Sequence, residues 1–427
     1  MKLLPHQLDV LEQTKDCDHV AYYLDMGLGK TFVGAEKLKQ IGNEVNLVIC
    51  QKSKIKDWLE HFQQNYHCMT LDLTNKADFQ AFINESDRRV NDVVGIINYE
   101  LAWRRKYLLT LTDFTLMLDE SSLISNHTAK QTKFVMKLKP QAVILLSGTP
   151  TSGKYERLWT QAKLLGWNIK HTVYDNTYIN YESVAIGGVH YRQVSKTEPY
   201  KNVDRLKRKF REHGAVFLKT EEVLNLPKQI VSLVKVDTKN LCEFKDDSDY
   251  YGTDITPRTE LIATTALTKR LYARQLASEF NPHKIKALKE LMESTDERLI
   301  IFYNFNSELE QMKRICKAQN RPVSEVNGHC KDLRSYEAYD DSVTFVQYQA
   351  GAMGINLQKA NKIIYFSLPE RSELFEQSKK RIHRLGQNKP CFYYVLLADG
   401  TVDWMIYKAL KMRKDFTDEL FRSGLSG

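Results

Sequence analysis

The chain has 427 residues, of which 42% are hydrophobic and 27% charged. This length predicts two or three domains, and the composition is that of a globular protein rather than a disordered tail. No apolar run approaches the ~20 residues of a membrane helix, and the first residues lack the long apolar stretch of a signal peptide, which argues against a membrane or secreted protein. The formal net charge of +9 suits a polyanionic partner, although it also fits an ordinary solvated surface.

Short apolar runs alternate with amphipathic stretches through the first half of the chain. Runs that are apolar at successive positions are expected for parallel strands buried on both faces. Their alternation with helical patterns predicts a doubly wound α/β sheet. The predicted strands are residues 20–24, 45–50, 93–97, 115–118 and 143–146, and the predicted helices are 31–41, 55–62 and 130–138.

A second α/β set begins after residue 295. Its predicted strands are 298–302, 343–347, 362–366 and 392–397, and its predicted helices are 284–293, 307–318, 375–384 and 402–421. Pro227 resists helix continuation and favours a linker. The predicted organisation is a first lobe over 1–166, a helical insertion over 167–225, a linker with a second helical insertion over 226–283, and a second lobe over 284–427.

A glycine-rich string follows the first predicted strand and precedes a predicted helix. The string is Asp25-Met26-Gly27-Leu28-Gly29-Lys30-Thr31. In this context the glycines let backbone N–H groups approach phosphate oxygens, and the helix presents its positive N-terminus. Lys30 can reach the β- and γ-phosphates, and the Thr31 hydroxyl can bind Mg²⁺. The string therefore predicts a phosphate loop, although Leu24 stands where the full pattern has its first glycine.

Two further strands end in residues that suit phosphate chemistry. The strand 115–118 runs into Asp119 and Glu120 at the sheet edge where the phosphate loop is expected. Asp119 can hold Mg²⁺, and Glu120 can polarise the attacking water. The strand 143–146 runs into Ser147-Gly148-Thr149-Pro150. That turn is predicted to contact the γ-phosphate or a nucleic-acid phosphate, with an ordinary turn as the alternative.

Two arginines mark the second half. Arg381 and Arg384 are three residues apart, which would place both on one face of a helix. Two guanidinium groups on one face suit a bound triphosphate, as arginine fingers do. The alternative is a solvated basic face.

In this order the segments resemble the Swi/Snf (sucrose-non-fermenting) family of double-stranded DNA translocases, among the helicase-like ATPases of superfamily two. The narrowest match is Arg381-Ile382-His383-Arg384-Leu385-Gly386-Gln387, which is similar to the sixth motif of that family. Gln7 lies in a segment that resembles the adenine-reading Gln motif. Further resemblances are carried by 48–53 with Trp58, 98–100, 147–150, 217–227, 300–306 and 354–357.

The resemblance implies two RecA-like lobes with ATP and Mg²⁺ bound in the cleft. It implies catalytic roles for Lys30, Asp119, Glu120, Arg381 and Arg384, with Thr31 and Asp119 toward the metal. Nucleotide contacts are expected from Gln7, from Asp25 through Thr31, and from Gly354 and Gln387. Contacts with DNA are expected from Lys52, Ser53, Asn98 and Thr149.

The chain departs from the family pattern at the acidic motif. Ser121 and Ser122 follow the carboxylates where the family has Ala and His, which leaves open how that motif is joined to the 147–150 turn. The short insertions suggest a bare, monomeric motor of bacterial or phage type in the cytoplasm rather than a nuclear remodeller. Duplex DNA, bound without sequence preference, is the expected partner, with a DNA-bound protein partner left open. The alternatives are a strand-separating DNA or RNA helicase and a DNA-binding module with a decayed ATPase.

Overall fold

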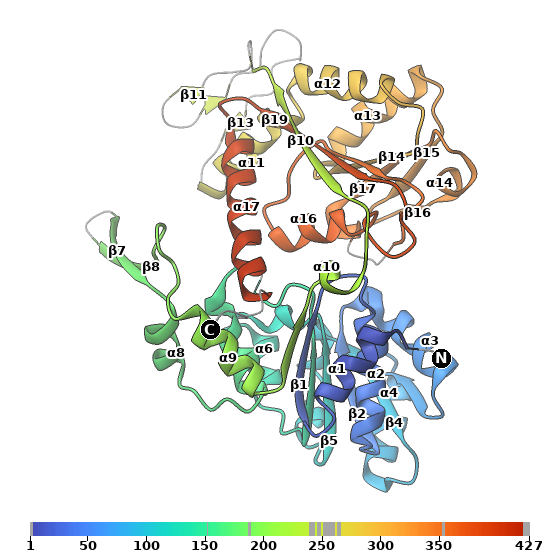
Figure 1. Cartoon of the computed structure of the whole chain (residues 1–427), viewed down its shortest axis with the longest axis vertical. Coiled ribbons are helices and arrows are strands. Elements are labelled where there is room, and N and C mark those ends of the chain that lie inside the picture. The colour runs from blue at the N-terminus through green and yellow to red at the C-terminus, as the bar shows by residue number, and fades with distance from the viewer. Residues whose placement is uncertain are drawn as a thin grey trace. The chain divides into compact units, whose positions relative to one another are not determined.

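The computed structural model describes residues 3–151, 153–186, 189–238, 244–245, 249–250, 261–262, 266–351 and 355–421. The chain divides into two compact units, Met1–Leu224 with Asp415–Gly427, and Asn225–Lys414. Figure 1 draws most of the first unit in blue to green and most of the second in yellow to red. Each unit is built around its own seven-stranded sheet.

The first sheet is entirely parallel, with the strand order β3-β4-β2-β5-β6-β1-β9. Its strands are β1 (His19–Leu24), β2 (Val45–Cys50), β3 (Met69–Asp72), β4 (Val93–Asn98), β5 (Phe114–Asp119), β6 (Ala142–Leu146) and β9 (Ala215–Leu218). Its α-helices are α1 (Pro5–Gln13), α2 (Lys30–Ile41), α3 (Ile55–Asn65), α4 (Lys76–Arg88), α5 (Tyr99–Ala102), α6 (Lys130–Val135), α7 (Trp159–Leu164), α8 (His171–Tyr178), α9 (Val203–Glu212) and α10 (Thr220–Val223). Short 3-10 turns are η1 (Lys52–Lys54), η2 (Lys106–Leu109), η3 (Ser121–Ile124) and η4 (Tyr155–Leu158).

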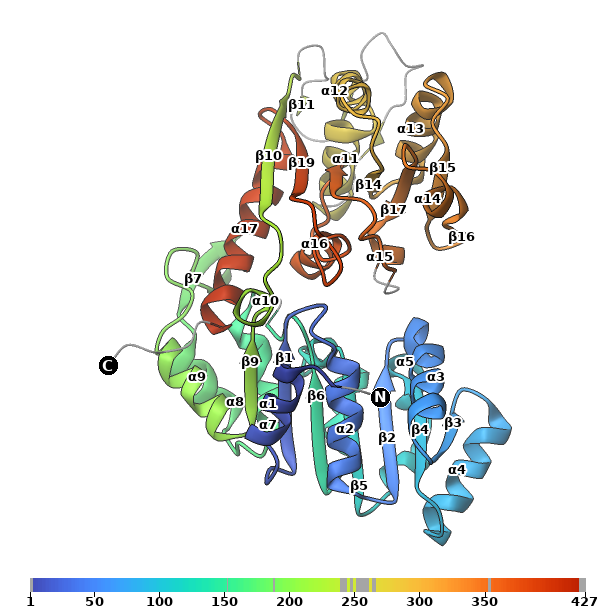
Figure 2. The same cartoon turned by 45° about the vertical axis from the view of Figure 1, so that its right-hand side comes forward.

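Both faces of this sheet are buried. Along β1, Ala21 and Tyr23 belong to one hydrophobic cluster, whereas Val20, Tyr22 and Leu24 belong to another. Because successive side chains of a strand point to opposite faces, the two clusters lie on opposite sides of the sheet. Helix α2 covers one of these faces, packing across β1, β5 and β6 (Figure 2). This double burial explains why the central strands are mostly apolar along their whole length.

The second sheet has the order β10-β19-β18-β14-β17-β15-β16 and is parallel except where β16 pairs with β15. Its strands are β10 (Gln229–Val236), β14 (Leu299–Tyr303), β15 (Val323–Val326), β16 (Lys331–Asp332), β17 (Val343–Gln347), β18 (Lys362–Tyr365) and β19 (Cys391–Ala398). The helices are α11 (Ala266–Ser278), α12 (Pro282–Glu293), α13 (Asn306–Ala318), α14 (Arg334–Ala338), α15 (Tyr348–Gly351), α16 (Ser372–Lys379) and α17 (Val402–Phe421). Small antiparallel ribbons are formed by β7 (Tyr181–Ile186) with β8 (Val189–Val194), and by β11 (Phe244–Lys245), β12 (Asp249–Tyr250) and β13 (Leu261–Ile262).

The prediction of two doubly wound parallel sheets is confirmed. The region 167–225, expected to be helical, also contains the β7–β8 hairpin and the strand β9, which completes the first sheet beside β1. The strand β10 occupies sequence that was assigned to the linker. Both strands lie at sheet edges and are partly exposed. Polar residues interrupt the apolar pattern of β10, whereas β9 is a short run of four apolar residues.

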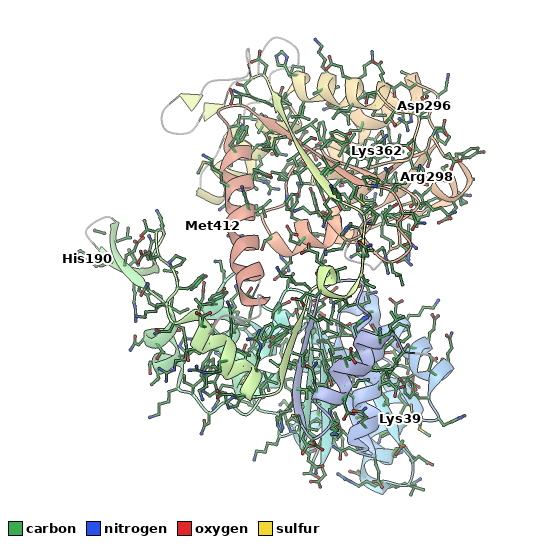
Figure 3. The ribbon with its side chains drawn as sticks, viewed as in Figure 1. Lys39, His190, Asp296, Arg298, Lys362 and Met412 are labelled. Atoms are coloured by element: carbon green, nitrogen blue, oxygen red, sulfur yellow. The ribbon has the colours of Figure 1, made fainter. Side chains whose placement is uncertain are left out.

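Side chains fill the space between each sheet and its helices (Figure 3). Two of the labelled residues, Arg298 and Lys362, stand where β14 and β18 begin. Arg298 donates to the backbone oxygen of Tyr336 at 2.9 Å, and Lys362 Nζ donates to Thr295 Oγ1 at 2.7 Å. Both cations therefore form hydrogen bonds within the second unit, at the edge of the sheet where its strands begin. Parallel sheets bind ligands at the opposite edge.

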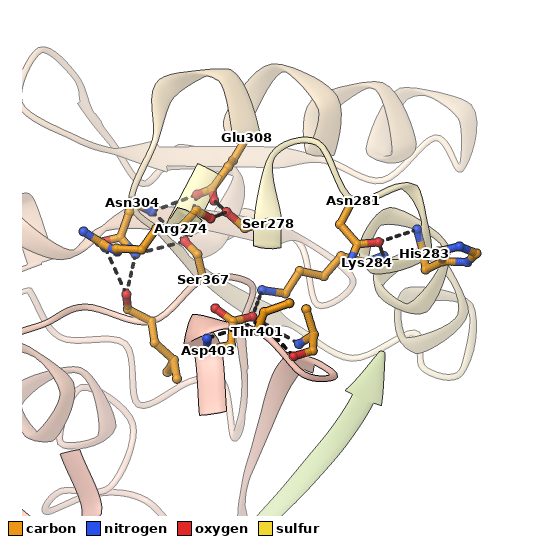
Figure 4. A network of polar contacts seen from close by, with 12 residues as sticks. Arg274, Ser278, Asn281, His283, Lys284, Asn304, Glu308, Ser367, Thr401 and Asp403 are labelled. Atoms are coloured by element: carbon orange, nitrogen blue, oxygen red, sulfur yellow. Dashed lines mark hydrogen bonds and ion pairs between the residues drawn. The ribbon is translucent and has the colours of Figure 1, made fainter. Parts of the chain in front are cut away.

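Glu308 on α13 is fully buried in the second unit. Its carboxylate accepts hydrogen bonds from Ser278 Oγ at 2.5 Å and from Ser367 Oγ at 2.8 Å. The backbone N–H of Asn304 also donates to it at 3.0 Å (Figure 4). The backbone N–H of Phe305 donates to it at 3.0 Å as well. Burial raises the pKa of Glu308, and these donors offset only part of that effect.

The raised pKa of Glu308 predicts a pH-dependent stability of the second unit. The folded chain holds this proton more tightly than the unfolded chain, whose carboxyl has its ordinary pKa of 4.5. The stabilisation is therefore full below pH 4.5 and is lost as the pH rises through the folded pKa. We expect Glu308→Gln to remove this loss, as measured by urea unfolding of the full chain between pH 4 and 8. The exposed Glu310, replaced in the same way, is the matched control. Parallel pH profiles for wild type and Glu308→Gln would contradict the prediction.

Candidate functional site

Three loops meet at one edge of the first sheet. The strands β5, β6 and β1 are neighbours, with Asp119 beside Leu146 and Leu146 beside Tyr22. Because the strands are parallel, the residues that follow each of them emerge at the same edge. The glycine-rich string, the acidic pair and the 147–150 turn are therefore brought together, as the sequence predicts.

The glycine-rich string forms the turn between β1 and α2. Gly27 and Gly29 have φ values of 88° and 78°, in the left-handed region that favours glycine. Lys30 is the first residue of α2, and its Nζ donates to the backbone oxygen of Leu24 at 3.0 Å. The loop therefore combines the conformation, the helix N-terminus and the cation that a phosphate requires.

Gln7 packs directly against this loop. Its Nε2 donates to the backbone oxygen of Leu28 at 3.1 Å, and its Oε1 accepts from the N–H of Leu4 at 2.9 Å. A Cβ at Gly29 would lie 2.1 Å from Gln7 Nε2, so this contact also requires glycine. The structure thus places Gln7 beside the phosphate loop, while its contact with adenine stays a prediction.

The acidic pair is held by aromatic residues. Asp119 ends β5, and its Oδ2 accepts a hydrogen bond from Trp58 Nε1 at 2.9 Å. Tyr99 Oη donates to the backbone oxygen of Asp119 at 2.8 Å. Glu120 adopts a left-handed backbone with φ of 52°, which turns the chain sharply after the strand. The Asp119 carboxylate and the Thr31 hydroxyl are hard oxygen donors of the kind that Mg²⁺ prefers, and their role as metal ligands stays a prediction.

The 147–150 turn lies against the phosphate loop. A Cβ at Gly148 would lie 3.1 Å from Met26 Cγ and 3.2 Å from Lys30 Nζ, so this approach is tight. Ser147 Oγ stabilises the turn by accepting from the N–H of Thr149 at 3.1 Å. Thr149 is only 8% exposed, and its Oγ1 has no hydrogen-bond partner among the described residues. Its contact with DNA stays a prediction and requires this turn to open.

The other residues predicted to contact DNA follow neighbouring strands. Lys52 and Ser53 come after β2 and are exposed, whereas Asn98 ends β4 and is buried. Asn98 Nδ2 donates to Glu100 Oε2 at 2.6 Å. All three lie at the same edge of the sheet as the phosphate loop, because β4, β2 and β5 are parallel neighbours. Their role toward DNA is a prediction.

The prediction that Arg381 and Arg384 share a helix face is wrong. Helix α16 ends at Lys379, and both arginines lie in the turns that follow. His383 Nε2 contacts the backbone oxygen of Pro227 at 2.9 Å, and the N–H of Leu357 donates to the backbone oxygen of Arg381 at 3.1 Å. These tertiary contacts hold the segment in a non-helical path. Arg384 donates to Asn356 Oδ1, and burial lowers the pKa of Arg384.

The buried Gln387 side chain stabilises the turns that contain Arg381 and Arg384 through hydrogen bonds to the backbone. Its Nε2 donates to the backbone oxygens of Ala360 at 2.9 Å and Gln358 at 3.1 Å, and its Oε1 accepts from the N–H of Lys389 at 2.9 Å. The side chain therefore has a structural task, and its contact with the nucleotide stays a prediction. Gly354, also predicted to contact the nucleotide, lies outside the described residues.

Sequence reasoning missed a contact that joins the phosphate loop to α10. Thr220 Oγ1 donates to Asp25 Oδ2 at 2.8 Å, although the two residues are 195 positions apart. Trp58 and Tyr99 were noted for resembling motifs but not for holding Asp119. All three residues lie in segments that resemble family motifs, and that position was the only signal in the sequence. A lone Thr, Trp or Tyr predicts no particular chemistry.

Comparison with known families decides the classification. A family model described as "SNF2-related domain" matches residues 23–241, which is half of the chain, and one described as "Helicase conserved C-terminal domain" matches residues 283–386. The chain belongs to the SNF2-related family. The resemblance to Swi/Snf proteins is confirmed, and the second match falls on the second unit.

Relatives of this SNF2-related chain come from several kingdoms. "SWI/SNF-related matrix-associated actin-dependent regulator of chromatin subfamily A-like protein 1" of Drosophila melanogaster is 23% identical over 92% of this chain and 52% of its own length. YwqA of Bacillus subtilis (strain 168), provisionally named an ATP-dependent helicase/translocase, is 23% identical over 93% of this chain and 46% of its own length. The chain spans about half the length of these curated relatives.

A solved structure was also found, the Sulfolobus solfataricus SWI2/SNF2 ATPase core in complex with dsDNA. It aligns at 18% identity and a TM-score of 0.47, over 99% of this chain and 94% of that chain. Within the SNF2-related chain, none of the described helices combines the length and apolar character that crossing a membrane requires.

Proposed function

We propose that this SNF2-related chain is an ATP-dependent translocase on double-stranded DNA. The observation that carries the proposal is the meeting of three loops at one sheet edge: the phosphate loop with Lys30, the acidic pair, and the 147–150 turn packed on Lys30. Those loops contain the groups that bind a triphosphate, activate a water and sense the phosphate. Family membership and the names of the relatives supply the link to DNA.

Each site residue has a defined task in this proposal. Lys30 neutralises the β- and γ-phosphates, and the glycines admit their oxygens to backbone N–H groups. Glu120 accepts the proton of the attacking water. Thr31 and Asp119 would hold Mg²⁺, which when bound would supply positive charge to stabilise the transferring phosphoryl group. Trp58 keeps one Asp119 oxygen engaged and so orients the other. Arg381 and Arg384 are proposed as the arginine fingers.

The proposed interaction with DNA uses backbone phosphates. Lys52 and Ser53 are exposed after β2, and Asn98 and Thr149 stand at neighbouring strand ends. Contacts of this kind carry little sequence information and weaken as salt rises. We further propose a monomeric motor of bacterial or phage type that works in the cytoplasm. The Bacillus relative supports the bacterial part of this proposal.

A paired assay tests the proposed function. Duplex DNA should stimulate ATP turnover more than single-stranded DNA or RNA does. A third strand laid in the major groove ahead of the protein should be displaced when ATP is present, whereas a forked duplex should stay annealed. Lys30→Ala, which should lack turnover, shows whether displacement depends on hydrolysis. Efficient fork unwinding, or stimulation by RNA alone, would instead favour the strand-separating helicase. Duplex binding without any turnover in the wild type would favour the decayed ATPase.

A further inference from the structure

A buried glutamine outside every motif-like segment joins the loops of the site. Gln161 lies on α7 and is 0% exposed. Its Oε1 accepts hydrogen bonds from Tyr23 Oη at 3.0 Å and Ser121 Oγ at 2.9 Å. Its Nε2 donates to the backbone oxygen of Pro150 at 2.9 Å. One side chain therefore contacts three segments that are far apart in the sequence.

Each partner of Gln161 adjoins a functional loop. Tyr23 lies on β1, two residues before Asp25 and the phosphate loop. Ser121 directly follows Glu120, and Pro150 is the last residue of the 147–150 turn. Tyr23 and Ser121 are themselves 0% exposed. These bonds are thus shielded from water, which would otherwise compete for the same donors and acceptors.

The chemistry of these contacts selects glutamine. The Pro150 carbonyl can only accept, so the amide nitrogen must face it, and the amide oxygen then faces the two hydroxyl donors. A carboxylate would leave the Pro150 carbonyl without a donor, and an apolar side chain would leave both hydroxyls without this acceptor.

Thr160, next to Gln161, provides a second bond between α7 and the turn η3. Thr160 Oγ1 donates to the backbone oxygen of Ile124 at 2.9 Å. Ser121 and Ile124 are the first and last residues of η3, so α7 fastens this turn at both ends. The turn begins immediately after Glu120, whose left-handed backbone places its side chain.

We propose that Gln161 is a positioning residue for ATP hydrolysis. It holds Glu120, through Ser121, and the 147–150 turn, through Pro150, at fixed positions relative to the strand that carries the phosphate loop. In this proposal the task of Ser121, which follows the acidic pair, is to bond Gln161 and so hold Glu120 in place. The inference rests on the proposed ATPase function.

The test compares steady-state ATP turnover and nucleotide binding in full-length variants. Gln161→Leu should lower kcat on the order of 10²-fold, as expected when a reacting group is misplaced by about 1 Å. The KM for ATP and the affinity for a fluorescent ADP analogue should change far less, because the phosphate loop itself is intact. Gln141→Leu, the same change at an exposed position, should behave as wild type.

Two further variants separate positioning from folding. Ser121→Ala keeps Gln161 and its packing but removes the bond from Ser121 Oγ, directly after the acidic pair, and it should also lower kcat at unchanged KM. Because both changes break one linkage, the double variant should lose less than the product of the single losses. The Ser121→Ala result would hold even if Gln161→Leu folded poorly.

The outcomes distinguish the two proposals. Wild-type kcat in Ser121→Ala, or a loss in Gln161→Leu that appears only as a lower melting temperature, would overturn the positioning role and leave the ATPase proposal standing. Lack of turnover in the wild-type protein with duplex DNA would overturn the proposed function, and the positioning role with it.

Discussion

Lys30→Ala is expected to abolish ATP turnover while the first unit stays folded. Lys30 is the first residue of α2 and directly follows the glycines of the phosphate loop. Its Nζ lies 3.0 Å from the backbone oxygen of Leu24 and 3.5 Å from that of Asp25. The ammonium group supplies the loop with the positive charge that faces the β- and γ-phosphates. Alanine is a good helix former, so the helix should persist.

The measurement is phosphate release with saturating duplex DNA, together with a thermal unfolding curve. Lys39→Ala is the matched control, because Lys39 lies in the last turn of the same helix and is exposed (Figure 3). Turnover in Lys30→Ala equal to that of Lys39→Ala would contradict the assignment of the phosphate loop.

Arg384→Ala is expected to lower kcat by roughly 10³-fold or more, the effect of removing an arginine finger in phosphoryl transfer. The guanidinium would stabilise charge that develops on the transferring phosphoryl group, so its loss should weaken ATP binding much less than it slows hydrolysis. Arg384 is partly buried and donates to Asn356 Oδ1, which holds it in the turn after α16.

Single-turnover hydrolysis and ATP binding, measured side by side, test this expectation. Arg314→Ala is the control, because Arg314 is an exposed arginine on α13 of the same unit. A wild-type rate in Arg384→Ala would contradict the finger. A loss of ATP affinity as large as the loss of rate would indicate a ground-state contact instead.

The central strands were predictable because successive residues along each of them are buried in the same apolar environment. A strand buried on both faces is mostly apolar, and β2 and β5 show this in the sequence. Asn46 and Thr115 are their buried polar exceptions. The edge strand β10 has no such pattern, because Gln229, Ser232 and Lys235 interrupt it and most of its positions are exposed. Its pairing with β19 identifies it as a strand. The four residues of β9 are apolar, but three of them are partly exposed, and pairing with β1 places β9 at the sheet edge.

The chemistry of the phosphate loop and the acidic pair was determined by the sequence itself. Glycines, a lysine and carboxylates at strand ends are local features, and parallel topology brings strand ends to one edge whatever the details of packing. The same locality explains the error at Arg381 and Arg384. Spacing of three residues suggests a helix, but α16 ends at Lys379, and the chain beyond it contacts Pro227 through His383, 156 positions away in the sequence.

Gln161 shows what only the tertiary structure decided. In the sequence it is a single amide in a short helix of mixed polar and apolar residues, and nothing nearby indicates a partner. Its hydroxyl donors are 138 and 40 positions away, and its backbone acceptor is 11 positions away. A hydrogen-bond network of this kind exists only after α7 has packed against the strand ends, because burial removes water and leaves these groups to satisfy one another.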